Sequence, residues 1–101
     1  MNNEVLNAIK PRRSIRKYKA EQITDEQLDA ILEAGTYAAT GMGKQSPVIV
    51  VVQKPELIAK LSKMNAAVMG TTSDPFYGAP TVLIVLADPE RGTYVEDLSL
   101  I

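Results

Sequence analysis

Residues 46–55 read Ser-Pro-Val-Ile-Val-Val-Val-Gln-Lys-Pro, and this stretch decides the fold of the chain. The five residues from Val48 to Val52 form an unbroken apolar run, with no alternation of apolar and polar side chains. A run of this kind is typical of a strand that is covered on both faces. The sequence therefore predicts a central strand at Val48–Val52, and Lys54-Pro55 turns the chain after it.

A helix is predicted directly after this strand, because Pro55 suits the first helical position. It is expected to reach about Ala67, and its apolar stripe consists of Leu57, Ile58, Leu61, Met64 and Val68. A loop follows at Met69–Pro80, where glycines and prolines interrupt the helical pattern. A second buried strand is predicted at Thr81–Ala87 and ends at Asp88-Pro89.

Two further helices are predicted before the central strand. The first runs from about Asn3 to Ile9, with an asparagine cap at its start and Pro11 beyond its end. The second begins at about Asp25, because Thr24-Asp25-Glu26-Gln27 has the form of a capping box. It is expected to reach Ala38 or Ala39, where Thr40–Gly43 changes the pattern to a loop.

The last predicted element is a helix that begins at Thr93. Thr93-Tyr94-Val95-Glu96 again has the form of a capping box, and Asp97 adds an acidic residue that the dipole of the first turn favours. No C-terminal capping signal follows before Ile101, so we expect the sequence to stop inside an element.

Composition excludes several classes of function. The chain contains no His and no Cys, which excludes Ser-His-Asp and Cys-His catalysis, disulfides and nearly every zinc or copper site. Its 11 basic and 12 acidic residues give a net charge of −1, so no global field attracts nucleic acid or an anionic membrane surface. The apolar runs are too short to cross a bilayer, and the start of the chain lacks the features of a signal peptide. A cytoplasmic protein is expected.

The basic residues are nevertheless concentrated. Six of the 11 lie between Lys10 and Lys19, directly after the first predicted helix. The forked guanidinium groups of Arg12, Arg13 and Arg16 suit a phosphate, and the Ser14 hydroxyl adds a neutral donor. A solvated surface is the alternative, and the residues alone leave the two interpretations about equal.

In this order of elements, the chain resembles the N-terminal part of the nitroreductase family of flavin enzymes. The motifs that carry the resemblance are Arg12-Arg13-Ser14-Ile15-Arg16 after the first helix, Ala38–Pro47 before the valine-rich strand, Phe76–Pro80 before the second strand, and Asp88–Ser99. The last of these is similar to the entry to the long central helix of the family. Members of the family continue well beyond residue 101, so residues 1–101 are expected to form a partial FMN-binding domain whose C-terminal part is absent.

The resemblance implies both a fold and a function. The fold is an α+β, three-layer α/β/α sandwich with a mainly antiparallel sheet, whereas handedness alone would make the two strands a parallel β-α-β unit. The function is that of a homodimer with FMN at its interface, which passes reducing equivalents from NADH or NADPH to an organic acceptor such as a nitroaromatic or a quinone. A chain without His or Cys suits this chemistry, because the flavin performs it. The alternative is a non-catalytic flavin-binding or dimerisation fragment.

Seven residues are candidate FMN contacts by this resemblance. Arg12, Arg13, Ser14 and Arg16 are expected to face the phosphate, the ribityl chain and the pyrimidine edge. Asn65 matches a position that contacts the flavin in relatives, although the residues alone also allow a solvent-facing asparagine near a helix end. Thr40 and Gln45 belong to a segment that one subunit extends over the flavin of the other. The alternative for this segment is that Gly41 and Gly43 only form a turn. No catalytic side chain and no metal ligand is predicted.

Overall fold

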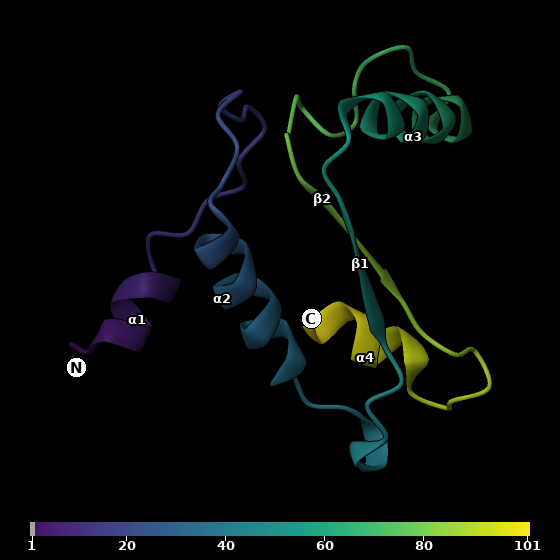
Figure 1. Ribbon diagram of the computed structural model, residues 1–101. Helices are drawn as coiled ribbons and strands as arrows, with labels where there is room; N and C mark the ends of the chain where they lie inside the picture. The colour runs from purple at the N-terminus through teal and green to yellow at the C-terminus, as the bar shows by residue number, and fades with distance from the viewer. Residues whose placement is uncertain (1) are drawn as a thin grey trace.

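A computed structural model describes residues 2–101, and Figure 1 shows how the elements are arranged. The elements in chain order are α1 (Glu4–Ile9), α2 (Asp25–Thr36), the 3-10 turn η1 (Gly41–Gly43), β1 (Val48–Val52), α3 (Pro55–Met69), β2 (Val82–Leu86) and α4 (Tyr94–Leu100). Over residues 2–101, no helix has the length and apolar character needed to cross a membrane. The α+β class predicted from the sequence is confirmed.

The two strands form an antiparallel sheet. Val48 lies opposite Leu86, and Val50 lies opposite Ile84. The prediction from the family resemblance is therefore confirmed, and the parallel unit that handedness alone favours does not form. The connection contains α3 and the loop after it, which is long enough for the chain to reverse its direction before β2.

Helices border the sheet on both faces. Leu83 and Ile84 are consecutive residues of β2, so their side chains point to opposite faces. Leu83 lines a hollow together with Leu28 and Ile31 of α2. Ile84 lines another hollow with residues of α3, including Leu61. The sheet therefore lies between α2 and α3, as expected for a three-layer arrangement.

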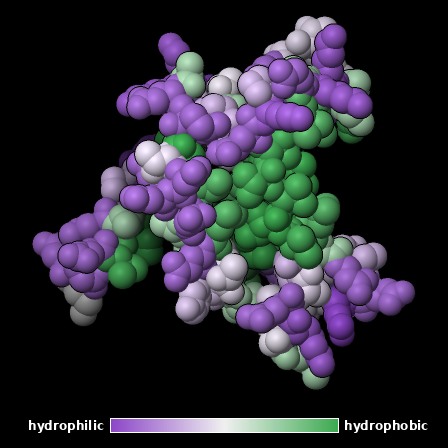
Figure 2. Space-filling model, viewed as in Figure 1, coloured by the Kyte–Doolittle hydropathy of each residue, from purple (hydrophilic) through white to green (hydrophobic). Residues whose placement is uncertain are grey.

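The expectation that β1 is a central strand covered on both faces is not met within residues 2–101. There β1 has a single neighbour, β2, and Val48 and Val50 keep 58% and 39% of their surface exposed. Figure 2 shows a broad apolar patch in the middle of the molecule. Val52 and Ala66 are the buried hydrophobic residues of the described chain. The apolar run thus predicts the strand correctly, but these residues alone do not bury it.

The first two helix starts form as their sequences predict. The Asn3 side chain accepts a hydrogen bond from the Leu6 backbone N–H at 2.8 Å. In the Thr24 capping box, the Gln27 N–H donates to Thr24 Oγ1 at 3.1 Å, and the Thr24 N–H donates to Gln27 Oε1 at 3.0 Å. These bonds satisfy N–H groups that have no partner inside the first turn.

The helix ends and the last capping box differ from the predictions. Helix α2 ends at Thr36, before the predicted Ala38 or Ala39, and α3 continues to Met69 until Gly70 ends it in the left-handed conformation (φ 72°). The capping box predicted at Thr93 is wrong. Thr93 forms no side-chain cap: its backbone lies at φ −113° and ψ 26°, outside the extended region typical of a capping residue, and its hydroxyl donates to Asp97 Oδ2 at 3.3 Å.

The loop between α3 and β2 is organised by one carboxylate. Asp74 accepts hydrogen bonds from the Ser62 hydroxyl at 2.7 Å, the Phe76 N–H at 2.9 Å and the Gly78 N–H at 2.8 Å. The bond from Ser62, followed by the two backbone bonds, lowers the pKa of Asp74, and burial opposes this only in part. The loop that leads into β2 is therefore held to α3 by its own residues.

Candidate functional site

The basic segment of residues 12–16 is exposed and lies between α1 and α2. Arg13 Nη1 donates to the carbonyl oxygens of Lys10 at 3.2 Å and Arg12 at 2.8 Å, which fixes this side chain along the backbone. Within residues 2–101, the side chains of Arg12, Ser14 and Arg16 form no hydrogen bond, so their donors face solvent. Two guanidinium groups and a hydroxyl form a donor set whose chemistry fits a phosphate.

The segment is attached to the start of β2 beyond its basic residues. The Tyr18 N–H donates to the carbonyl oxygen of Tyr77 at 3.4 Å. Gln22 Nε2 donates to the carbonyl oxygen of Pro80 at 2.9 Å, and the Thr81 hydroxyl donates to Gln22 Oε1. These contacts join residues that are far apart in sequence, so the position of the segment depends on the sheet.

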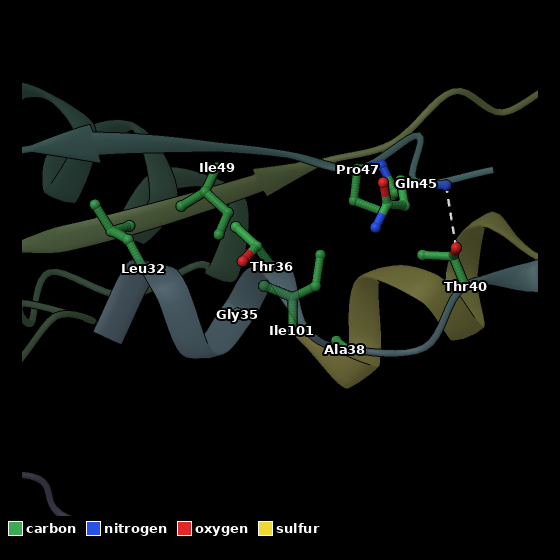
Figure 3. A pocket seen from close by; sticks show the side chains of 9 residues that line it. All are labelled: Leu32, Gly35, Thr36, Ala38, Thr40, Gln45, Pro47, Ile49 and Ile101. Carbon is green, nitrogen blue, oxygen red and sulfur yellow. Dashed lines mark hydrogen bonds between the residues drawn. The ribbon is translucent and has the colours of Figure 1, made fainter. Parts of the chain in front are cut away.

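The loop after α2 has a backbone that few sequences adopt. The Gln45 N–H donates to Thr40 Oγ1 at 3.0 Å, as the dashed line in Figure 3 shows, and this bond closes the loop. Met42 and Gln45 have positive φ angles of 55° and 50°, which are uncommon for residues other than glycine. Such conformations persist only where surrounding contacts fix them.

One of these contacts comes from the far end of the chain. Asp97, in the first turn of α4, is 3% exposed and accepts a hydrogen bond from the Gly41 N–H at 2.9 Å through Oδ1. Its second oxygen accepts the Thr93 hydroxyl. A Cβ atom at Gly41 would overlap Thr93 Oγ1 and lie 3.0 Å from Thr93 Cβ, so the backbones approach closely here. Gly43, by contrast, serves the turn through its φ of 65°.

A pocket of about 410 Å³ lies between the loop, α2 and β1 (Figure 3). Thr40 and Gln45 line one end of it, and Leu32 and Ile49 line the other. The Ser46 hydroxyl, next to this pocket in sequence, is buried and has no hydrogen-bond partner in the described residues. Buried polar side chains usually have a hydrogen-bond partner, so the Ser46 hydroxyl is an exception in this region.

The structure places the seven predicted contacts in three separate regions. The segment with Arg12, Arg13, Ser14 and Arg16 lies at the start of α2, whereas Thr40 and Gln45 lie beyond its end (Figure 1). Asn65 lies on α3, is exposed, and borders a hollow with Leu61 and Phe76. A single chain therefore does not bring the three groups together. The exposure of Asn65 fits both a flavin contact and the solvent-facing alternative.

Two residues of the loop region are not found by reading the sequence. Asp97 reads only as a first-turn acid, because its partner Gly41 is 56 positions away. Ser46 reads only as part of a loop, and burial of its hydroxyl depends on the tertiary structure. Among residues 2–101, no group of three His, Cys, Asp or Glu side chains could hold a metal ion.

Comparison with known proteins shows which family and which solved structures the chain is similar to. The model of the nitroreductase family matches residues 9–99. An FMN reductase [NAD(P)H] from Bacillus subtilis is 34% identical over 98 residues, which are 95% of this chain and 37% of that protein. A crystal structure of a nitroreductase with bound FMN from Bacteroides fragilis superposes with a TM-score of 0.87 at 31% identity, covering 98% of this chain and 60% of that one.

The similarity extends over only part of the related proteins. A relative from Archaeoglobus fulgidus is 33% identical over 95 residues, which are 94% of this chain and 52% of that protein. A second archaeal relative, from Methanothermobacter thermautotrophicus, is covered to 50% of its length. The chain thus spans about half the length of these curated relatives, and almost all of its own residues take part in the match.

Proposed function

Because the chain belongs to the nitroreductase family, we propose that the protein containing it is an FMN-dependent oxidoreductase. It passes reducing equivalents from NADH or NADPH to an organic acceptor such as a nitroaromatic or a quinone. The observation that carries this proposal is the exposed donor set of Arg12, Ser14 and Arg16, whose side chains are not used in hydrogen bonds within residues 2–101. The composition of the chain agrees with it, since no His or Cys is needed when a flavin performs the chemistry.

The residues of the chain bind and orient the cofactor in this proposal. Bound FMN supplies the hydride chemistry. Arg12 and Arg16 hold the phosphate and the polar edge of the cofactor through charge-assisted hydrogen bonds, and Ser14 adds a hydroxyl donor. Arg13 contributes the donors that its contacts with Lys10 and Arg12 leave unused. Positive charge near the ring also favours reduced flavin, which is negatively charged.

The protein is proposed to be a homodimer with FMN at the interface. In one chain, the basic segment and the Thr40–Gln45 loop lie at opposite ends of α2 (Figure 1). Twelve helical residues span about 18 Å, and in the proposed dimer each cofactor takes the basic segment from one chain and the loop from the other. Exposed apolar residues of the sheet, among them Val48 and Leu86, also favour an interface.

A flavin assay on the full-length protein that contains this chain tests the enzymatic function. We expect the purified protein to be yellow, with flavin absorbance that bleaches when NADH or NADPH is added without oxygen. Subsequent addition of a nitroaromatic or a quinone should restore the absorbance. Bound flavin that neither NADH nor NADPH bleaches would favour the alternative of a non-catalytic flavin-binding module, and absence of flavin binding would leave only a non-catalytic dimerisation fragment.

Sedimentation with and without FMN tests the shared site. If both chains contribute contacts, we expect FMN to sediment with the dimer only, and dilution into monomers to release it. The release follows because a monomer retains either the basic segment or the loop at each site, but not both. A monomer that stays saturated with FMN would contradict the shared site while leaving FMN binding intact.

A further inference from the structure

We propose that Asp97 is a positioning residue for the flavin site, because its carboxylate fixes the loop that carries Thr40 and Gln45. This inference rests on the function proposed above. It concerns a contact between α4 and the loop after α2, which are 56 residues apart where they meet. Asp97 itself is not proposed to touch the cofactor.

The burial of Asp97 requires a specific reason. Among the charged residues within residues 2–101, Asp97 alone is buried, with 3% of its surface exposed. A buried carboxylate costs free energy unless hydrogen bonds compensate it, and Asp97 receives one from the Gly41 N–H and one from the Thr93 hydroxyl. The first of these partners belongs to the loop. The same hydrogen bond therefore compensates the buried carboxylate and holds the loop against α4.

The hydrogen bond between Gly41 and Asp97, called the anchor below, lies at the base of the loop. The loop residues beyond it are exposed. Gly41 is held against Thr93, at a distance that leaves no space for a side chain. Beyond it, Met42 is 92% exposed and Gln45 is also exposed. Both have positive φ angles, so the loop would relax to other conformations if its attachment were lost.

Loss of the anchor should therefore weaken the contacts of Thr40 and Gln45 with FMN. A binding group held by supporting hydrogen bonds must stay within about 0.5 Å of its productive position. The Thr40 hydroxyl already accepts the Gln45 N–H, so displacement of Gly41 moves both residues together. Asp97 would then affect FMN affinity only through this loop, which distinguishes positioning from general stabilisation.

The experiment is a double-mutant cycle in the full-length protein that contains this chain, measured by titration of the apoprotein with FMN. Asp97→Ala should weaken FMN binding about tenfold, because displacement of the loop would cost one or two neutral hydrogen bonds between FMN and Thr40 or Gln45. In a Thr40→Ala/Gln45→Ala background, the same substitution should weaken binding by less than about twofold, because the contacts on which it acts are already absent. Asp97→Asn should restore affinity to within about threefold, since its amide oxygen can still accept the Gly41 N–H.

Val52→Ala is the matched control. Val52 is a buried strand residue, 5% exposed, and its truncation destabilises the fold without removing a contact of the loop. The thermal midpoint of each apoprotein is measured alongside its affinity. Val52→Ala should lower the midpoint but leave FMN affinity within about twofold of the unmutated protein.

Three results would overturn the inference while the proposed function stands. These are unchanged affinity in Asp97→Ala, an equal loss of affinity in Val52→Ala, and an undiminished effect of Asp97→Ala in the Thr40→Ala/Gln45→Ala background. An unmutated protein that does not bind FMN would overturn both. If Asp97→Ala does not fold, Asp97→Glu takes its place in the cycle, because it keeps the charge and displaces the carboxylate by one methylene group.

Discussion

Arg12→Ala and Arg16→Ala are each expected to weaken FMN binding about 10- to 150-fold in the full-length protein that contains this chain. Each substitution removes a charge-assisted hydrogen bond to the cofactor, which is worth about 1.5–3 kcal/mol. The structure supports the size of this effect, because both side chains are exposed and form no hydrogen bond within residues 2–101. Their donors are thus available to a ligand without first breaking a contact of the protein.

Lys17→Ala is the matched control for this pair. Lys17 lies in the same exposed segment, next to Arg16, but outside the Arg-Arg-Ser-Ile-Arg motif. Its removal changes the net charge by the same amount, so a general electrostatic attraction would weaken FMN binding equally in all three variants. We expect a smaller loss for Lys17→Ala. If the arginine variants bind FMN as tightly as the unmutated protein, the basic cluster is a solvated surface and not a phosphate site.

Gly41→Ala is expected to destabilise the protein by about 2–3 kcal/mol, near the upper end of the cost of an overpacked site. The added Cβ would overlap Thr93 Oγ1, and the Thr93 Cβ lies only 3.0 Å away, so the loop must move away from α4. This movement would also stretch the 2.9 Å bond from the Gly41 N–H to Asp97. Denaturant unfolding of the full-length protein measures the loss.

Gly43→Ala provides a contrasting control in the same loop. No atom lies within 4 Å of a Cβ at Gly43, but its φ is 65°, so the expected cost is the conformational penalty of about 1–2 kcal/mol. Thr93→Ala should partly relieve the effect of Gly41→Ala, because it removes the overlapping hydroxyl, and should not relieve that of Gly43→Ala. Equal costs with no relief by Thr93→Ala would contradict the close-approach explanation.

Local sequence signals predicted every α-helix and both strands of the described residues, whereas the 3-10 turn η1 was predicted as a loop. The capping box at Thr24 and the asparagine cap at Asn3 form as expected, because each bond joins residues within three positions of one another. The unbroken valine run and the proline at Pro55 mark β1 and the start of α3 in the same way. The antiparallel pairing did not follow from such signals. It came from the family resemblance, against the generic preference for a parallel unit.

The sequence by itself determined the donor chemistry of this protein: a basic Arg-Arg-Ser-Ile-Arg motif, no His, no Cys, and the helices and strands that separate the motifs. The tertiary structure decided which residues meet. Asp97, which the sequence places only in the first turn of a helix, accepts the Gly41 N–H from 56 positions away. Such contacts cannot be read from local patterns, because the two partners come together only when the loop after α2 packs against α4.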